Sequence, residues 1–287
     1  MLQAGCITAA ALASAAHAQN RPAAQKQKGT DSKMHLGIVT YNVASEWDLD
    51  TILKICRNTR MEAVEFRTGH KHGVEPTLGA TQRLDLKAKL AASGLKQISL
   101  GSTCEFNSDA QDTVNKNIQS CADFVTLAKS IGARAVKVRP NGLVKGLTPE
   151  QSFEQIGKAL ARCGKFAEDN GVEIWMEVHG GPTQMPAAAH SIMQACGHKN
   201  VGLTWNSNHT EIEKGSVKAA FELLQPWIRC CHITELWNDY PWRELFGLLK
   251  KSGYDRYTLC EIGAVIRPED GEPFLNCYRR LWEEFGA

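Results

Sequence analysis

From His35 onward, short runs rich in β-branched and aromatic residues alternate with longer segments of helical periodicity. The runs predict eight strands, at residues 36–41, 63–66, 97–100, 135–138, 173–176, 201–205, 228–233 and 257–260. The segments that follow them predict eight helices, at residues 48–60, 82–93, 112–131, 149–170, 186–196, 216–224, 242–252 and 272–285. Strict alternation is typical of parallel α/β folds, because parallel strands need a crossover connection and a helix supplies it.

Eight strand–helix units in succession predict a single-domain (β/α)8 barrel, or TIM barrel, at residues 34–287. An open, doubly wound sheet is the alternative, and such a sheet usually carries a glycine fingerprint after its first strand. The sequence at that place, Tyr41-Asn42-Val43-Ala44, contains no glycine. The closed barrel is therefore the preferred fold.

The N-terminal segment differs from the rest of the chain. Residues 1–18 contain no Lys, Arg, Asp or Glu, are rich in alanine and end in Ala16-His17-Ala18, a pattern that suits signal peptidase. We expect residues 1–18 to be a signal peptide, residues 19–33 to be a polar linker, and the protein to be periplasmic or secreted. The charged start of a signal peptide is missing, as expected of a truncated or misassigned start, and a disordered alanine-rich tail is the alternative.

Charge and cysteine content exclude several classes of partner and site. The net charge of +2 gives no electrostatic argument for nucleic acid or an anionic membrane surface, and no later apolar run could span a bilayer. The ten cysteines form no zinc-binding spacing. Cys230, Cys231 and Cys260 lie in apolar strands, where small buried side chains are expected. The sequence leaves homo-oligomerisation and disulfide pairing open.

Four polar residues, Glu177, Asn206, His232 and Glu261, close the last four apolar runs at intervals of 29, 26 and 29 residues. The carboxyl ends of the strands form the active site in barrels of this kind, so these side chains are expected to converge. Two carboxylates, an imidazole and an amide oxygen can hold a divalent cation. The carboxylates Glu177 and Glu261 could also move protons on a bound substrate.

Other polar or aromatic residues at the predicted strand ends are candidates for substrate binding: Glu65, Lys137, Arg139, His179, Trp205, Asn208 and His209. An aromatic ring beside polar donors can form a platform for a sugar, although core packing explains a tryptophan equally well. Glu177 or Glu261 could instead be a buried acid paired with Lys137 or Arg139, and His232 could be a hydrogen-bonded core residue. His70 and His72 are weaker candidates, because their loop reads as exposed and solvated.

From about His35 to its end, the chain resembles the sugar phosphate isomerase/epimerase superfamily, the xylose-isomerase-like TIM barrels. Members carry Glu, Asp, His and Glu on strands five to eight around one divalent metal, and Glu177, His232 and Glu261 match three of these positions. Asn206-Ser207-Asn208-His209 aligns with the family's Asp-x-x-His, whose His contacts substrate in ketose epimerases. The resemblance implies a metal site at Glu177, Asn206, His232 and Glu261 for Mn, Zn, Co or Mg, and a small carbohydrate substrate.

Asn206 departs from the family pattern. Its amide oxygen can ligate a hard cation but adds no charge, so either metal affinity is reduced or Asn206 contacts substrate directly. The implied activity is isomerisation or epimerisation of a keto sugar by proton abstraction next to a carbonyl, with Glu177 and Glu261 as base and acid. A lyase or hydratase on keto-glycosides is one alternative, because it uses the same chemistry. A non-catalytic carbohydrate-binding barrel, for which Asn206 would be the sequence signature, is the other.

Overall fold

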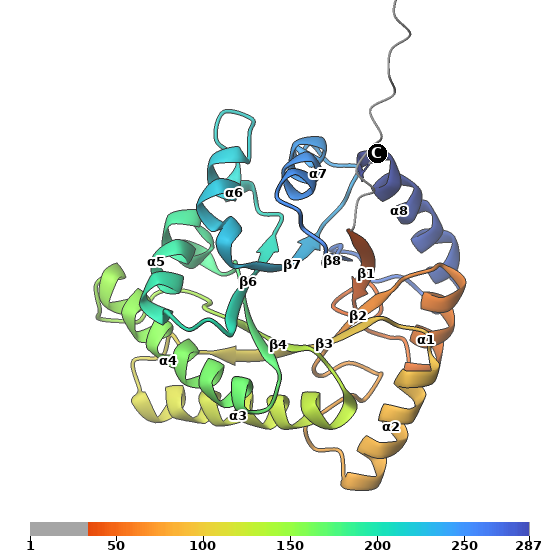
Figure 1. Ribbon diagram of the computed structural model, residues 1–287, viewed down its shortest axis with the longest axis horizontal. Helices are drawn as coiled ribbons and strands as arrows, with labels where there is room; N and C mark the ends of the chain where they lie inside the picture. Colours follow the sequence, from red (N-terminus) through yellow and green to blue (C-terminus); the bar gives the residue numbers. More distant parts are fainter. Residues whose placement is uncertain (1–33, 287) are drawn as a thin grey trace, which may run out of the picture. The chain divides into compact units, whose positions relative to one another are not determined.

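The computed structural model describes residues 34–286, so the signal peptide and linker predicted at residues 1–33 lie outside the described part of the chain. Eight parallel strands form one closed barrel in chain order, with β8 hydrogen-bonded to β1. The strands occupy the centre and the helices surround them (Figure 1). The strands are β1 (His35–Val39), β2 (Ala63–Arg67), β3 (Gln97–Glu105), β4 (Ala135–Arg139), β5 (Glu173–Glu177), β6 (Val201–Asn206), β7 (Ile228–Ile233) and β8 (Tyr257–Cys260). The prediction of a (β/α)8 barrel is confirmed.

One α-helix follows each strand, and short 3-10 helices occur in four of the connections. The α-helices are α1 (Leu49–Asn58), α2 (Ala80–Ala92), α3 (Gln111–Ile131), α4 (Pro149–Asp169), α5 (Pro186–Cys196), α6 (Lys218–Leu224), α7 (Trp242–Lys251) and α8 (Gly271–Gly286). The 3-10 helices are η1 (Gly181–Gln184), η2 (His209–Glu211), η3 (Gln225–Trp227) and η4 (Pro268–Asp270). None of the helices in residues 34–286 combines the length and the apolar character needed to cross a membrane.

Strand β3 is longer than the sequence predicts. The prediction ends at residue 100, because Gly101-Ser102-Thr103 reads as a loop, but the strand continues to Glu105. Its pairing with β4 shifts in register between Gly101 and Glu105, which is the effect of a β-bulge. The extension places Glu105 beside the end of β4.

Alternation along the strands divides the apolar residues into two cores. The outward side chains pack beneath the helices, while a smaller set fills the barrel: Val39, Ala63, Ala135, Trp175, Cys230 and Leu259. Trp175 is the largest of these, and glycines on two other strands allow close approach between neighbouring strands. A Cβ at Gly37 would lie 2.4 Å from the Ala63 carbonyl oxygen, and one at Gly202 would lie 2.2 Å from Arg229 Cγ. The barrel is therefore a filled core and not a pore.

The described residues include nine free cysteines, of which only Cys277 is exposed. Cys230, Cys231 and Cys260 are fully buried, so the prediction that they act as small apolar side chains is confirmed. Burial raises the pKa of each of these three thiols above its ordinary value. They are therefore protonated and unreactive near neutral pH.

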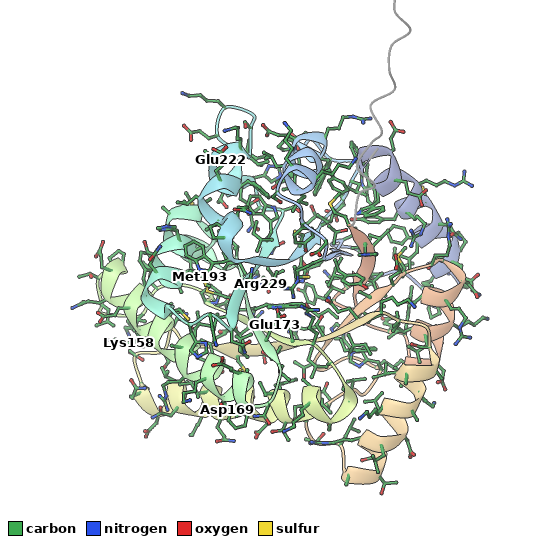
Figure 2. All side chains as sticks on the ribbon, viewed as in Figure 1. Lys158, Asp169, Glu173, Met193, Glu222 and Arg229 are labelled. Atoms are coloured by element: carbon green, nitrogen blue, oxygen red, sulfur yellow. The ribbon has the colours of Figure 1, made fainter. Side chains whose placement is uncertain are left out.

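An ionic cluster closes the amino-terminal end of the barrel. Glu173 Oε2 accepts hydrogen bonds from Arg256 and from Trp175 Nε1, each at 2.7 Å, and Glu173 Oε1 accepts one from Arg134 Nε at 3.0 Å. Glu173 and the neighbouring Arg229 lie inside the ring of helices, whereas Lys158 and Glu222 lie on its outside (Figure 2). Burial would raise the pKa of Glu173, but the charge of Arg256 and the hydrogen bond from Trp175 lower it below its ordinary value. This end of the barrel serves stability.

We expect Glu173→Gln to destabilise the protein by about 1–3 kcal/mol at pH 7, because it removes the charge that pairs with the partly buried Arg256 and with the more exposed Arg134. The folded pKa of Glu173 lies below its unfolded value near 4.5, so this stabilisation is present above that pH and is lost as the pH falls through the folded pKa. Urea unfolding of both proteins should therefore show a difference at pH 7 that shrinks in acid. An equal difference at both pH values would contradict the ionic role.

Candidate active site

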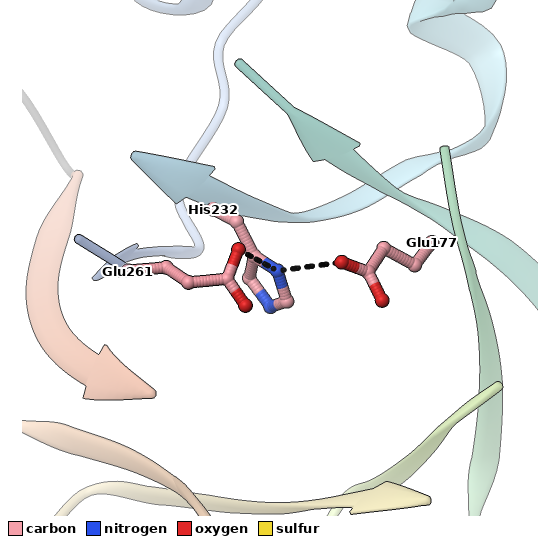
Figure 3. Close-up of side chains that lie close together, drawn as sticks. All are labelled: Glu177, His232 and Glu261. Carbon is pink, nitrogen blue, oxygen red and sulfur yellow. Dashed lines mark ion pairs between the residues drawn. The ribbon is translucent and has the colours of Figure 1, made fainter. Parts of the chain in front are cut away.

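Three of the four predicted metal ligands meet at the carboxyl end of the barrel. His232, on β7, lies between Glu177 at the end of β5 and Glu261 directly after β8 (Figure 3). Its Nδ1 atom is 3.1 Å from Glu261 Oε2 and 3.6 Å from Glu177 Oε1. The His232 side chain is fully buried, Glu177 is 4% exposed and Glu261 is 12% exposed. Glu261 is therefore the member of the cluster that is most open to a ligand.

Glu65 lies on the other side of the His232 ring. Glu65 Oε2 is 3.4 Å from His232 Nε2, and both side chains are completely buried. A proton on Nε2 would be held by Glu65, which leaves the Nδ1 lone pair directed at Glu177 and Glu261. Burial alone would lower the pKa of His232, but the carboxylates of Glu261 and Glu65 raise it well above its ordinary value. The cluster thus attracts a positive charge, either a proton or a metal ion, to the space around Nδ1.

The donor atoms fit a divalent cation. One atom from each of Glu177, His232 and Glu261 lies within 4.8 Å of the other two, and His232 Nδ1 is buried without a hydrogen-bond partner. An imidazole nitrogen with two carboxylates suits Zn, Mn or Co. Asn206 joins the cluster through its amide nitrogen, which donates to Glu177 Oε1 at 3.2 Å. Ligation by the Asn206 oxygen would require the amide to turn over, and it stays a prediction.

Lys137 controls the charge of Glu177. Its Nζ atom donates to Glu177 Oε2 at 2.6 Å, with the two side chains 5% and 4% exposed. Burial would raise the pKa of Glu177, but Lys137 and His232 lower it well below its ordinary value. Burial would likewise lower the pKa of Lys137, which Glu177 and Glu65 raise. The ion pair considered from the sequence is present for Glu177, whereas Glu261 pairs with no Lys or Arg in residues 34–286.

The remaining predicted binding residues lie around this cluster, and several connect neighbouring loops. His179 Nδ1 is 2.9 Å from Asn141 Oδ1, which ties the β5 loop to the β4 loop. Asn208 Nδ2 donates to the Val178 carbonyl at 2.7 Å, which ties the β6 loop to β5. His209 is exposed at the start of η2. Their contacts with substrate stay predictions.

Two residues differ from the sequence-based interpretation. Trp205 is 1% exposed and packs near Phe221, so the prediction that it binds substrate is wrong. The reason is strand alternation: Asn206 points into the barrel, and its neighbour Trp205 must point toward the helices. His72 is not solvated but 6% exposed, because Nε2 donates to the Arg67 carbonyl and Nδ1 accepts from the Val74 amide.

A buried acid beneath the β6 loop has no signal in the sequence. Tyr240 donates to Glu211 Oε2 at 2.8 Å and accepts from Trp205 Nε1 at 3.2 Å. Burial raises the pKa of Glu211 well above its ordinary value, which favours the protonated acid. This network anchors η2, the turn that carries His209. A single Glu in a polar turn normally reads as solvent-exposed, which is why the sequence does not reveal it.

Comparisons with known proteins agree with this architecture. Residues 53–273 of the 287 match the family model described as the xylose isomerase-like TIM barrel. Among solved structures, D-psicose 3-epimerase with D-tagatose from Clostridium cellulolyticum H10 has a TM-score of 0.72 at 17% identity, covering 88% of this chain and 98% of that one. The IOLI protein with a bound zinc atom has a TM-score of 0.73 at 17% identity, covering 88% and 98%.

The 3-keto-D-glucoside 4-epimerase YcjR from E. coli has a TM-score of 0.70 at 13% identity, covering 86% of this chain and 99% of that one. No curated protein sequence matches the chain. Solved structures with sequence identities of 13–17% establish the fold alone. The family model covers most of the barrel. The chain belongs to the xylose isomerase-like TIM barrel family.

Proposed function

We propose that the protein is a carbohydrate isomerase or epimerase that removes a proton from the carbon next to a carbonyl. The observation that carries the proposal is the placement of two carboxylates, Glu177 and Glu261, on either side of His232 Nδ1. These three residues form the buried floor of the site. Structural neighbours that act on sugars as 3-epimerases and a 4-epimerase support a carbohydrate substrate.

The two carboxylates have different surroundings, which suits different roles. Lys137 keeps Glu177 ionised, and Asn206 fixes the orientation of the Glu177 carboxylate. Glu261 contacts His232 but pairs with no Lys or Arg in residues 34–286, and it is the more accessible of the two, so it can accept or return a proton at the substrate carbon. A divalent ion held by Glu177, His232 and Glu261 would polarise the substrate carbonyl. Burial of the floor keeps water away from the reacting carbon.

A lyase acting on keto-glycosides is the second candidate. It is favoured by the likeness to the 3-keto-D-glucoside 4-epimerase YcjR. Both reactions begin with the same proton abstraction, and they differ in whether a substituent then leaves. Product analysis separates them, because an epimerase returns an intact sugar of altered configuration whereas a lyase releases the aglycone.

Solvent exchange tests the proposal directly. Metal-loaded protein is incubated in D2O with D-fructose, D-tagatose and methyl 3-keto-glucoside, and deuterium next to the carbonyl is followed by NMR. Incorporation with an intact product supports isomerisation or epimerisation, and incorporation with aglycone release supports the lyase. The absence of exchange with every sugar would favour the non-catalytic carbohydrate-binding barrel.

We expect the purified protein, after loading with Mn or Zn, to hold about one divalent ion per chain. His232→Ala should lose most of this metal, because it removes the only nitrogen ligand of the cluster. Asn206→Asp should bind the ion more tightly than wild type, because it adds a carboxylate. Elemental analysis and metal titration measure both changes. Unchanged metal content in His232→Ala would place the ion elsewhere.

A further inference from the structure

Two arginines, Arg67 at the end of β2 and Arg139 at the end of β4, lie near the acidic floor, and we call this pair the rim. Arg67 follows Glu65 by two residues on β2, so both side chains face the barrel interior. Arg139 closes β4 and pairs with Glu105, while its Nε atom is buried without a hydrogen-bond partner. Arg67 donates to the Thr68 carbonyl but forms no ion pair with any carboxylate in residues 34–286. A half-buried guanidinium without an anionic partner is unusual unless a ligand supplies one.

The position of Arg67 is fixed by its surroundings. Its backbone N–H donates to Thr40 Oγ1 at 2.9 Å, and its carbonyl accepts from His72 Nε2 at 2.9 Å. Burial lowers the pKa of His72 to about 4, so this histidine stays neutral and keeps that hydrogen bond at physiological pH. The guanidinium lies 5.7 Å from the centre of the Tyr41 ring. Arg67 is therefore held in place before any ligand arrives, which reduces the entropy cost of binding.

The two guanidinium groups differ in their partners. Burial lowers the pKa of Arg67 and the nearby positive charge of Arg139 lowers it further, whereas the carboxylates of Glu177 and Glu65 act in the opposite direction. Glu105 pairs with Arg139. Glu75, the carboxylate of the next loop, accepts hydrogen bonds from the Thr68 hydroxyl and the Gly69 amide and pairs with neither arginine. Within residues 34–286, Arg67 is thus the guanidinium of the two that can receive an anionic group of a ligand.

We propose that Arg67, assisted by Arg139, binds a carboxylate of the substrate, so that the substrate is an acidic sugar of the uronate class. This inference rests on the proposed function and adds a specificity determinant to it. The planar guanidinium matches a carboxylate with two parallel hydrogen bonds, and one guanidinium without a carboxylate partner favours a monoanionic carboxylate over a phosphate dianion. The sugar would then place its carbonyl end on the floor and its acidic end at the rim.

Three probes that share one ring test this inference: D-glucose, D-glucuronate and D-glucose 6-phosphate. Their binding to the metal-loaded protein is measured by calorimetry. We expect D-glucuronate to bind about 10- to 100-fold more tightly than D-glucose, as is typical of a charge-assisted hydrogen-bonded pair. Arg67→Met keeps an apolar stem over Tyr41 and should bring the two affinities together. Arg67→Lys keeps the positive charge but loses the planar group that donates two parallel hydrogen bonds, so it should retain part of the preference for D-glucuronate.

The matched control is Arg243→Met on α7, which removes an exposed guanidinium that pairs with Glu284 and should leave the preference unchanged. Three results overturn the inference: equal or absent binding of D-glucose and D-glucuronate by wild type, tighter binding of D-glucose 6-phosphate than of D-glucuronate, or an unchanged preference in Arg67→Met. Should Arg67→Met fail to fold, an unchanged preference in Arg67→Lys has the same force. Binding needs no turnover, so a preference without deuterium exchange rejects the proposed function and not the role of Arg67.

Discussion

Glu261→Gln is expected to lower the rate of proton exchange next to the substrate carbonyl by about 10²- to 10⁴-fold, the usual cost of losing a general base. The change keeps the size and hydrogen-bonding capacity of the side chain but removes its ability to accept a proton. Glu261 is the cleaner position for the test, because no Lys or Arg in residues 34–286 pairs with it. Glu177→Gln should also reduce the rate, but it leaves Lys137 buried without its partner.

The measurement is deuterium incorporation by NMR with the metal content of each variant determined in parallel. Metal content matters because a lost ion would imitate a lost base. The control is Glu283→Gln on α8, a half-exposed acid that lies near Arg60 and Arg279 and not in the cluster, which should exchange at the wild-type rate. Wild-type exchange in metal-replete Glu177→Gln and Glu261→Gln would refute the proton-transfer roles of both acids.

Trp175→Ala is expected to reduce the free energy of unfolding by about 3–5 kcal/mol, the range for large-to-small changes in a packed core. The Trp175 ring is completely buried inside the barrel, and the other members of the inner cluster are the smaller residues Val39, Ala63, Ala135, Cys230 and Leu259. The change also removes the Trp175 hydrogen bond to Glu173 and the ring beneath Arg256. Equilibrium urea unfolding at neutral pH measures the loss.

Trp237→Ala provides the matched control, because it removes the same side chain from a position that is 58% exposed. Its cost should be well below that of Trp175→Ala, since the exposed ring meets Phe274 and Tyr278 in T-shaped contacts. Equal losses in the two variants would mean that the barrel interior relaxes around the cavity.

The alternation of strand and helix, and the side chains that close the strands, could be predicted because both depend on local pattern. The convergence of Glu177, His232 and Glu261 follows from the barrel alone. The Lys137–Glu177 pair was one of the pairings that the sequence allowed, but the sequence could not select it. The Glu65–His232 contact could not be predicted, because it joins strands distant in sequence. The extension of β3 could not be predicted, because its Gly-Ser-Thr segment resembles a loop. The burial of Trp205 follows from strand alternation, because its neighbour Asn206 faces the barrel interior.

The floor and the access route to it are built from different kinds of structure. Glu177, Asn206 and His232 belong to strands, and the backbone of Glu261 continues the sheet by donating to the Ile233 carbonyl at 2.8 Å. Tyr41, His70 and His209 belong instead to connections. Insertions or exchanges in these connections can alter which molecules enter without shifting the strand-borne groups. The same framework can thus acquire a new substrate in evolution, or by loop grafting, while its chemistry is retained.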